Sequence, residues 1–232
     1  MAAALLSACG GAGGGGGGAT AAQAAANPNA QRAGAATVKI HDCTPKGAAN
    51  AADACWKGAT STAMTNVMAG SLPSGFAASF QAVWDMKNLY VLETVKNAAG
   101  FSTSNANPTT PWTTDAMEIY LSSDNGSDTG MAANDTQLDI SLGQPGTVWV
   151  LPGHDATGVV ATVKNVTGGY DAMMAIPWSA VGSTAGTGQA IGADPAADIY
   201  SDGTAQNQAL AWGTPGSGEQ NPSIWGQLVL EK

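Results

Sequence analysis

One short stretch of the sequence, residues 112–121, combines side chains that could bind a sugar. It reads Trp-Thr-Thr-Asp-Ala-Met-Glu-Ile-Tyr-Leu, so Trp112, Asp115 and Glu118 are close neighbours. An indole ring offers a flat apolar face, and a carboxylate accepts hydrogen bonds from hydroxyl groups. Because a sugar has C–H patches on its faces and hydroxyls at its rim, Trp112 and Glu118 are candidate ligand-binding residues. The alternative is that Trp112 closes one end of a core and that both carboxylates are solvated.

The pattern around these residues predicts the element that positions them. Apolar and polar residues alternate from Met117 to Leu121, which is typical of a half-buried strand with Glu118 on its polar face. Two prolines, Pro108 and Pro111, stand just ahead of Trp112 and disfavour a helix there. We therefore expect Trp112 on a loop or strand edge.

Short apolar segments separated by Gly and Asn recur along most of the remaining chain. They predict an all-β fold, a two-sheet antiparallel β-sandwich, with strands at 80–84, 89–95, 137–142, 148–151, 159–163, 170–176 and 224–230. Residues 182–218 are interpreted as loop-like apart from 209–212. The predicted core comprises Leu89, Val91, Met117, Ile119, Leu121, Ile140, Ile176, Leu228 and Leu230.

Motifs spread from about residue 38 to the C-terminus resemble family 9 carbohydrate-binding modules. These motifs occur in the family's order and lie at 83–91, 112–120, 169–178, 191–194 and 221–226. The resemblance implies a non-catalytic sandwich that binds a polysaccharide or oligosaccharide terminus between two Trp rings. Two departures weaken it: Met173 stands where the family has a glutamate, and no Lys or Arg occurs between Lys164 and Lys232.

The resemblance also implies which residues bind the sugar. The first Trp and the carboxylate fall on Trp112 and Glu118, and the amide and the second Trp fall near Asn221 and Trp225. Alternation along strand 224–230 points Trp225 away from Leu228 and Leu230, so we expect its ring to be partly exposed.

Two groups of aspartates are candidates for a structural calcium ion, the only cofactor that the sequence suggests. The first is the turn with Asp124 and Asp128, and the second contains Asp198 and Asp202. Calcium prefers six to eight oxygen ligands, and such turns supply them, but neither group has the order of an EF-hand loop. Ordinary turn chemistry is the alternative interpretation.

The N-terminus resembles a bacterial lipoprotein signal, because Leu6-Ser7-Ala8-Cys9 matches the lipobox. The predicted organisation is a partial signal at 1–8, a Gly- and Ala-rich tether at 9–36 and the sandwich domain at 37–232. The expected protein is exported and held at the outer membrane or cell surface by lipid on Cys9. An accidental match in an Ala-rich segment is the alternative.

The other two cysteines, Cys43 and Cys55, are predicted to form a disulfide. They are 12 positions apart, and a disulfide is the common state of such a pair in an exported protein.

Composition limits the other functions. The net charge of −9 and the eight Lys and Arg residues argue against nucleic acid as a partner. A cell-surface assembly protein that uses an edge strand such as 148–151 for protein contacts is the first alternative to sugar binding. Haem binding is the second, although core packing explains Met117, Met173 and Met174 better. We expect no enzyme, because no carboxylate is predicted to face Glu118 across a cleft.

Overall fold

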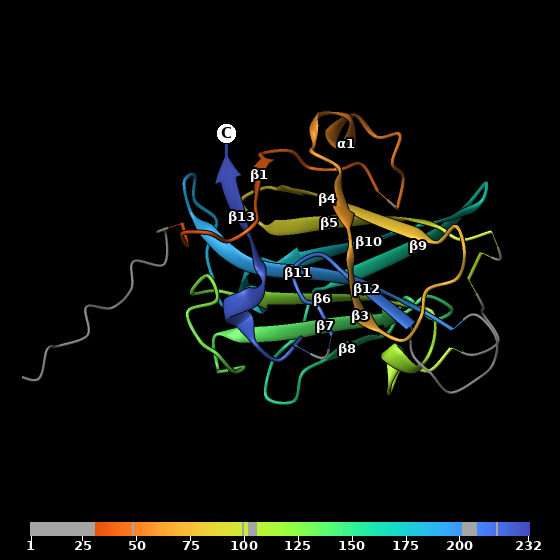
Figure 1. Cartoon of the computed structure of the whole chain (residues 1–232). Coiled ribbons are helices and arrows are strands. Elements are labelled where there is room, and N and C mark those ends of the chain that lie inside the picture. The colour runs from red at the N-terminus through yellow and green to blue at the C-terminus, as the bar shows by residue number, and fades with distance from the viewer. Residues whose placement is uncertain (1–30, 48, 99, 102–105, 201–207, 217) are drawn as a thin grey trace, which may run out of the picture.

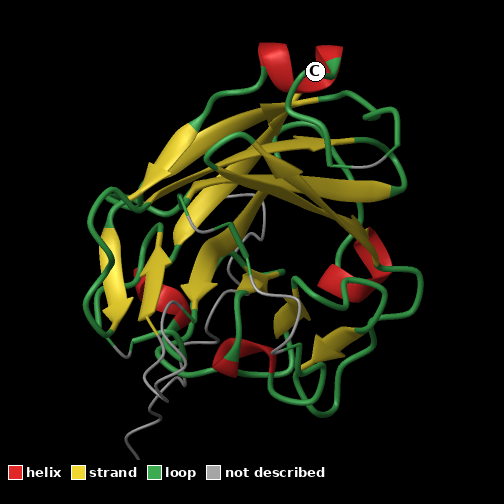
Figure 2. Cartoon of the chain, turned by 90° about the vertical axis from the view of Figure 1, so that its right-hand side faces the viewer, coloured by secondary structure: helices red, strands yellow, loops and turns green. Residues whose placement is uncertain are grey.

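The computed structural model describes residues 31–232, apart from 48, 99, 102–105, 201–207 and 217. Its strands form two sheets that pack face to face (Figures 1 and 2). The first, sheet A, has the order β1-β13-β11-β6-β7-β8, with β12 attached beside β11 and β3 beside β12. The second, sheet B, has the order β2-β4-β5-β10-β9. Among the described strand pairs only β1 and β13 run parallel, so the predicted antiparallel sandwich is confirmed.

The elements are short, as the sequence pattern indicated. Sheet A comprises β1 (Thr37–His41), β3 (Asn66–Ala69), β6 (Ala116–Ser122), β7 (Asp135–Ser141), β8 (Val148–Val150), β11 (Ala190–Ile199), β12 (Gln208–Ala211) and β13 (Gly226–Glu231). Sheet B comprises β2 (Thr62–Met64), β4 (Ala77–Trp84), β5 (Asn88–Lys96), β9 (Val160–Val166) and β10 (Gly169–Pro177). The described helices are α1 (Ala54–Gly58), α2 (Trp178–Val181) and the single-turn 3₁₀ helices η1 (Pro111–Thr113) and η2 (Pro222–Ile224), and none is long and apolar enough to cross a membrane.

The main core lies between the sheets. All nine residues predicted for it are buried in one hydrophobic cluster, because each alternating strand sends every second side chain inward. Met117 and Met174 belong to this cluster, and Met173 packs in a second cluster on the outer face of sheet B. The prediction that these methionines serve packing is therefore confirmed.

The second cluster lies beneath α1, which covers sheet B from outside (Figure 1). Asp53 caps α1 by accepting a hydrogen bond from the backbone N–H of Cys55 at 2.9 Å. Trp56 on α1 is buried, and Cys43 is disulfide-bonded to Cys55 with a Cα–Cα distance of 5.7 Å. The disulfide is as predicted, and Trp56 packs in the second cluster.

The region from 182 to 218 differs from its predicted loop-like character, because β11 is a ten-residue strand in the middle of sheet A. Pro195 hid this strand, since proline has no N–H to give to a central ladder. The structure accommodates Pro195 at the point where β11 changes its neighbouring strand. Ala190–Ala193 pair with β13, and Ala196–Ile199 pair with β12. Pro195 falls between the two ladders, where that side of β11 has no paired strand residue.

Candidate functional site

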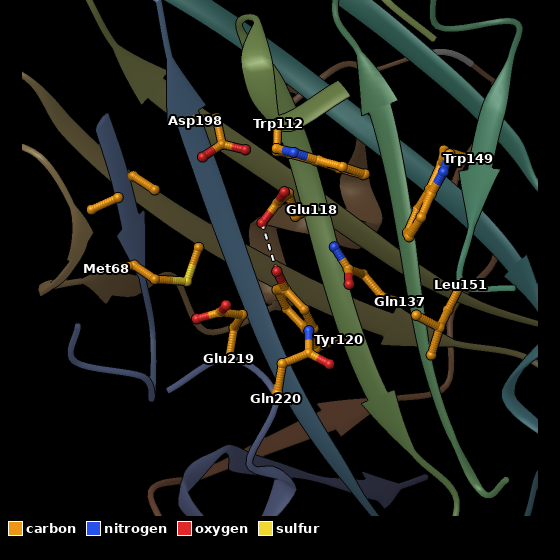
Figure 3. A pocket seen from close by; sticks show the side chains of 12 residues that line it. Met68, Trp112, Glu118, Tyr120, Gln137, Trp149, Leu151, Asp198, Glu219 and Gln220 are labelled. Carbon is orange, nitrogen blue, oxygen red and sulfur yellow. Dashed lines mark hydrogen bonds between the residues drawn. The ribbon is translucent and has the colours of Figure 1, made fainter. Parts of the chain in front are cut away.

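A pocket of about 350 Å³ lies on the outer face of sheet A (Figure 3). Strand β6 builds its floor, because the alternation that sends Met117 and Ile119 into the core sends Glu118 and Tyr120 to the opposite face. The side chains that line it come from β3, β6, β7, β8, β11, β12 and the segments before η2 and β6: Met68, Ala69, Trp112, Glu118, Tyr120, Gln137, Trp149, Leu151, Asp198, Ala209, Glu219 and Gln220.

Two tryptophans, Trp112 and Trp149, form an aromatic corner at one side of the pocket, opposite Met68 (Figure 3). Both are partly exposed, and their rings meet edge to face with centroids 4.9 Å apart and planes 80° apart. At that separation no sugar fits between them, so they present two walls at right angles rather than a clamp.

Trp149 is a site residue that the sequence interpretation missed. Val148 and Val150 pack against the core, so alternation along β8 sends Trp149 to the outer face. It stands in register with Asp139, which in turn stands opposite Glu118. The Val-Trp-Val pattern indicates that Trp149 faces outward. Only the strand order of sheet A shows that Trp149 lies beside Trp112.

Three neighbouring strands carry buried carboxyl groups at the floor: Glu118 of β6 and Asp198 of β11 line the pocket, and Asp139 of β7 stands opposite Glu118 in the sheet. Each is at least nine-tenths buried. Glu118 accepts a hydrogen bond from the Tyr120 hydroxyl at 2.8 Å, and Asp139 accepts one from the Gln137 amide at 2.9 Å. One oxygen of Asp139 and one of Asp198 receive no hydrogen bond from a donor group of the described residues, and the carboxyl groups of Asp198 and Glu118 share a hydrogen bond when one of them is protonated.

Burial changes the protonation of this group. It raises the pKa of Glu118 to about 7 and raises the pKa of both Asp139 and Asp198 well above the usual aspartate value. The charge of Glu118 raises the pKa of each aspartate further. None of the described lining residues is Lys, Arg or His. The three carboxyl groups therefore hold protons among themselves near neutral pH.

The structure corrects the prediction for Trp225. Its side chain points to the outer face of sheet A, as alternation required, but it is only 1% exposed. It packs against Tyr120 in a third cluster with Ala196 and Ala211, and its indole N–H donates to the backbone oxygen of Glu219 at 3.1 Å. A strand pattern shows which face a residue occupies but not whether other chain segments cover that face. Trp225 therefore packs against Tyr120 and does not line the pocket.

Asn221 makes local contacts in the structure, and the sugar-binding role implied for it stays a prediction. Its side-chain oxygen accepts hydrogen bonds from the backbone N–H of Ser223 at 3.2 Å and from the Ser223 hydroxyl at 2.6 Å, so it caps η2. It is absent from the pocket lining, whereas its neighbours Glu219 and Gln220 belong to it. Gln137 supplies an amide inside the pocket instead.

The two predicted calcium groups do not form one site. Asp124 accepts hydrogen bonds from the hydroxyls of Ser122, at 2.6 Å, and Ser127, whereas Asp198 belongs to the pocket floor. Across the described part of the chain, no group of three or more His, Cys, Asp or Glu side chains could hold a metal ion. Asp128 therefore belongs to no such group. Asp202 and the predicted lipid-bearing Cys9 lie outside the described residues, so calcium and lipid both remain predictions.

Comparisons with known proteins agree with this architecture. The family described as "Carbohydrate family 9 binding domain-like" matches residues 49–232. Endo-1,4-beta-xylanase A of Thermotoga neapolitana is 26% identical over 181 residues, which cover 78% of this chain but only 16% of the xylanase.

Two solved structures show the fold. They are a carbohydrate binding module family 9 from Caldicellulosiruptor kristjanssonii in complex with cellotriose and the module in complex with glucose. The first has a TM-score of 0.69 at 18% identity and covers 84% of this chain and 93% of the module. The second has a TM-score of 0.70 at 19% identity and covers 84% and 95%.

Proposed function

This chain belongs to the carbohydrate family 9 binding domain-like family, and we propose that it binds the terminal sugar of a polysaccharide or oligosaccharide in the sheet A pocket without catalysing a reaction. One observation carries the proposal: the aromatic corner of Trp112 and Trp149 stands over buried polar groups that have unused hydrogen-bonding capacity. The cellotriose and glucose in the two similar structures support the choice of ligand class.

The corner and the floor have complementary tasks. The C–H face of a sugar ring stacks on one indole, which removes apolar surface of both from water. Its hydroxyls then meet Glu118 and Gln137, which can accept and donate hydrogen bonds where no bulk water competes. A volume of about 350 Å³ is at the small end of ligand pockets, which favours a chain end over the middle of a long polymer.

The arrangement of the carboxyl groups supports binding rather than hydrolysis. Glycosidases place two carboxyl groups on opposite sides of the bond that breaks. Here Glu118 and Asp139 are cross-strand neighbours, and Asp198 lies on the strand at the other side of β6, so all three share one surface. We propose that the domain leaves its glycan intact.

Calorimetric titration with cellotriose tests the binding proposal. We expect the Trp149→Ala variant to bind at least about tenfold more weakly, because the loss of a stacking partner costs roughly 1.5 kcal/mol or more. Met86→Ala is the matched control, since Met86 is an exposed side chain in the β4–β5 turn of the other sheet. Equal binding by both variants and the unaltered protein would place the ligand elsewhere.

We further propose that the protein is exported and anchored through lipid on Cys9 at the outer membrane or cell surface. The Cys43–Cys55 disulfide supports export, because disulfides persist mainly in oxidising compartments. Metabolic labelling with a fatty acid tests the anchor: label that persists in a Cys9→Ser variant would show that the lipid is not on this residue.

A further inference from the structure

The pocket floor has an excess of negative groups. Glu118, Asp198 and Glu219 line it, Asp139 lies directly opposite Glu118, and none of the described lining residues is cationic. One buried oxygen of Asp198, which lines the pocket, receives no hydrogen bond from a donor group of the described residues. A buried polar atom without a partner costs about 1–3 kcal/mol, so this floor is incomplete without a ligand.

The chemistry that completes the floor is cationic. A neutral hydroxyl can donate one hydrogen bond, but it supplies no positive charge beside which these carboxyl groups could ionise. A primary ammonium group supplies three donors and a positive charge, and buried carboxylates need both. The indole faces of Trp112 and Trp149 favour a cation as well, through their ring quadrupoles. A uronic acid would meet like charge and be excluded.

We propose that the sugar recognised in this pocket carries a free, protonated amino group, as in a β-1,4-linked glucosamine chain end, with the ammonium group placed over Glu118 and Asp198. The proposal rests on the proposed carbohydrate-binding function and names the class of sugar that the site selects. The sugar ring stacks on the aromatic corner, and the amino group points to the floor.

A series of three trisaccharides tests this selectivity on the unaltered protein. The β-1,4-linked trimers of glucosamine, N-acetylglucosamine and glucose differ only in the substituent at C2. We expect the glucosamine trimer to bind at least about tenfold more tightly than the other two at near-neutral pH and moderate salt. If the glucose or acetylated trimer binds as tightly, the inference is wrong and the proposed function stands. If none of the three binds, both are wrong.

A pair of variants separates this site from the general attraction of an acidic protein for a cation. Asp198→Asn removes a floor charge with almost no change in shape, whereas Asp42→Asn removes one exposed charge beside sheet B. We expect the glucosamine preference to fall at least about fivefold in Asp198→Asn and to stay unchanged in Asp42→Asn. An equal fall in both would overturn the inference, and thermal unfolding of Asp198→Asn verifies that it is folded.

Proton release gives an independent measurement. The groups near Glu118 are Tyr120 on its own strand, Asp139 on β7, Asp194 and Asp198 on β11 and Glu219 before η2, and none of them is a cation. An ammonium group that binds there displaces protons shared by the carboxyl groups, and a neutral sugar does not. Titrations in buffers with different enthalpies of ionisation should therefore show proton release with the glucosamine trimer only, and no release would contradict the placement.

Discussion

Two regions of the sandwich bury carboxyl groups with no cation beside them. One region borders a pocket, and the other lies between the two sheets. In the sheet A pocket, Glu118 and Asp198 border a cavity that a ligand can enter. Glu93 of β5 instead points between the sheets, is 0% exposed, and has no hydrogen-bond partner for either oxygen among the described residues. Burial, and then the charge of Glu118, raises the pKa of Glu93 well above its ordinary value.

The comparison shows that the face of a sheet decides what a buried acid does. On the outer face the unused oxygens are available to a ligand, and binding recovers the cost of desolvation. Between the sheets, no ligand reaches a buried carboxyl group. Such a group therefore lowers the free energy of unfolding at any pH at which it is ionised in the unfolded chain. Each prediction below tests whether the two regions separate in this way.

The largest expected effect contrasts two tryptophans. Trp225→Ala empties a buried position behind Tyr120 and should lower the free energy of unfolding by about 3–5 kcal/mol. Trp149→Ala removes a partly exposed ring at the edge of the sheet and should cost much less stability while it weakens binding. Urea denaturation of both variants measures the difference, and comparable losses would mean that Trp149 is as structural as Trp225.

The next effect concerns Glu93. The pKa of Glu93 is higher in the folded protein than in the unfolded chain. Its favourable contribution to the free energy of unfolding is therefore complete below the pKa of the unfolded chain, and it is lost as the pH rises through the pKa of the folded protein. Glu93→Gln stays neutral, so it should raise the free energy of unfolding at neutral pH by about 1–3 kcal/mol and make stability less dependent on pH. Denaturation at several pH values checks this, and a destabilised variant at neutral pH would indicate a partner for the carboxylate.

A smaller effect is expected at Glu118. Its pKa rises from 4.5 to about 7 on folding, so its contribution to stability is lost between these pH values as the pH increases. Glu118→Gln should remove this part of the pH dependence and also weaken binding of the glucosamine trimer. The contrast with Glu93 is sharpest with ligand present: near neutral pH, a saturating trimer should raise the free energy of unfolding more in the unaltered protein than in Glu118→Gln. An equal rise in both would place the binding energy outside the carboxyl groups.

Much of the fold was predictable because strand alternation is a local signal. The nine core residues and the hairpin around Trp84 and Leu89 needed only period-two patterns, and the disulfide needed only the cysteine count. Half of the site followed for the same reason, because Trp112 and Glu118 flank one strand start.

The other half depended on long-range order that no local pattern carries. Trp149 reaches Trp112 only because β8 follows β7 in sheet A, and Trp225 is buried only because Met68 and the segment before η2 cover it. The pocket's third carboxylate, Asp198, was hidden for a different reason, since Pro195 made its strand resemble a loop.

The pairing of β1 with β13 joins the first described strand to the last. Contacts between such distant segments slow folding, because the intervening chain must be ordered before they form. During synthesis, the edge of sheet A cannot close until Gly226–Glu231 has been made. Sheet A of such a chain is completed only when β13 has emerged, so the pairing of β13 with β1 is the closing step of its assembly.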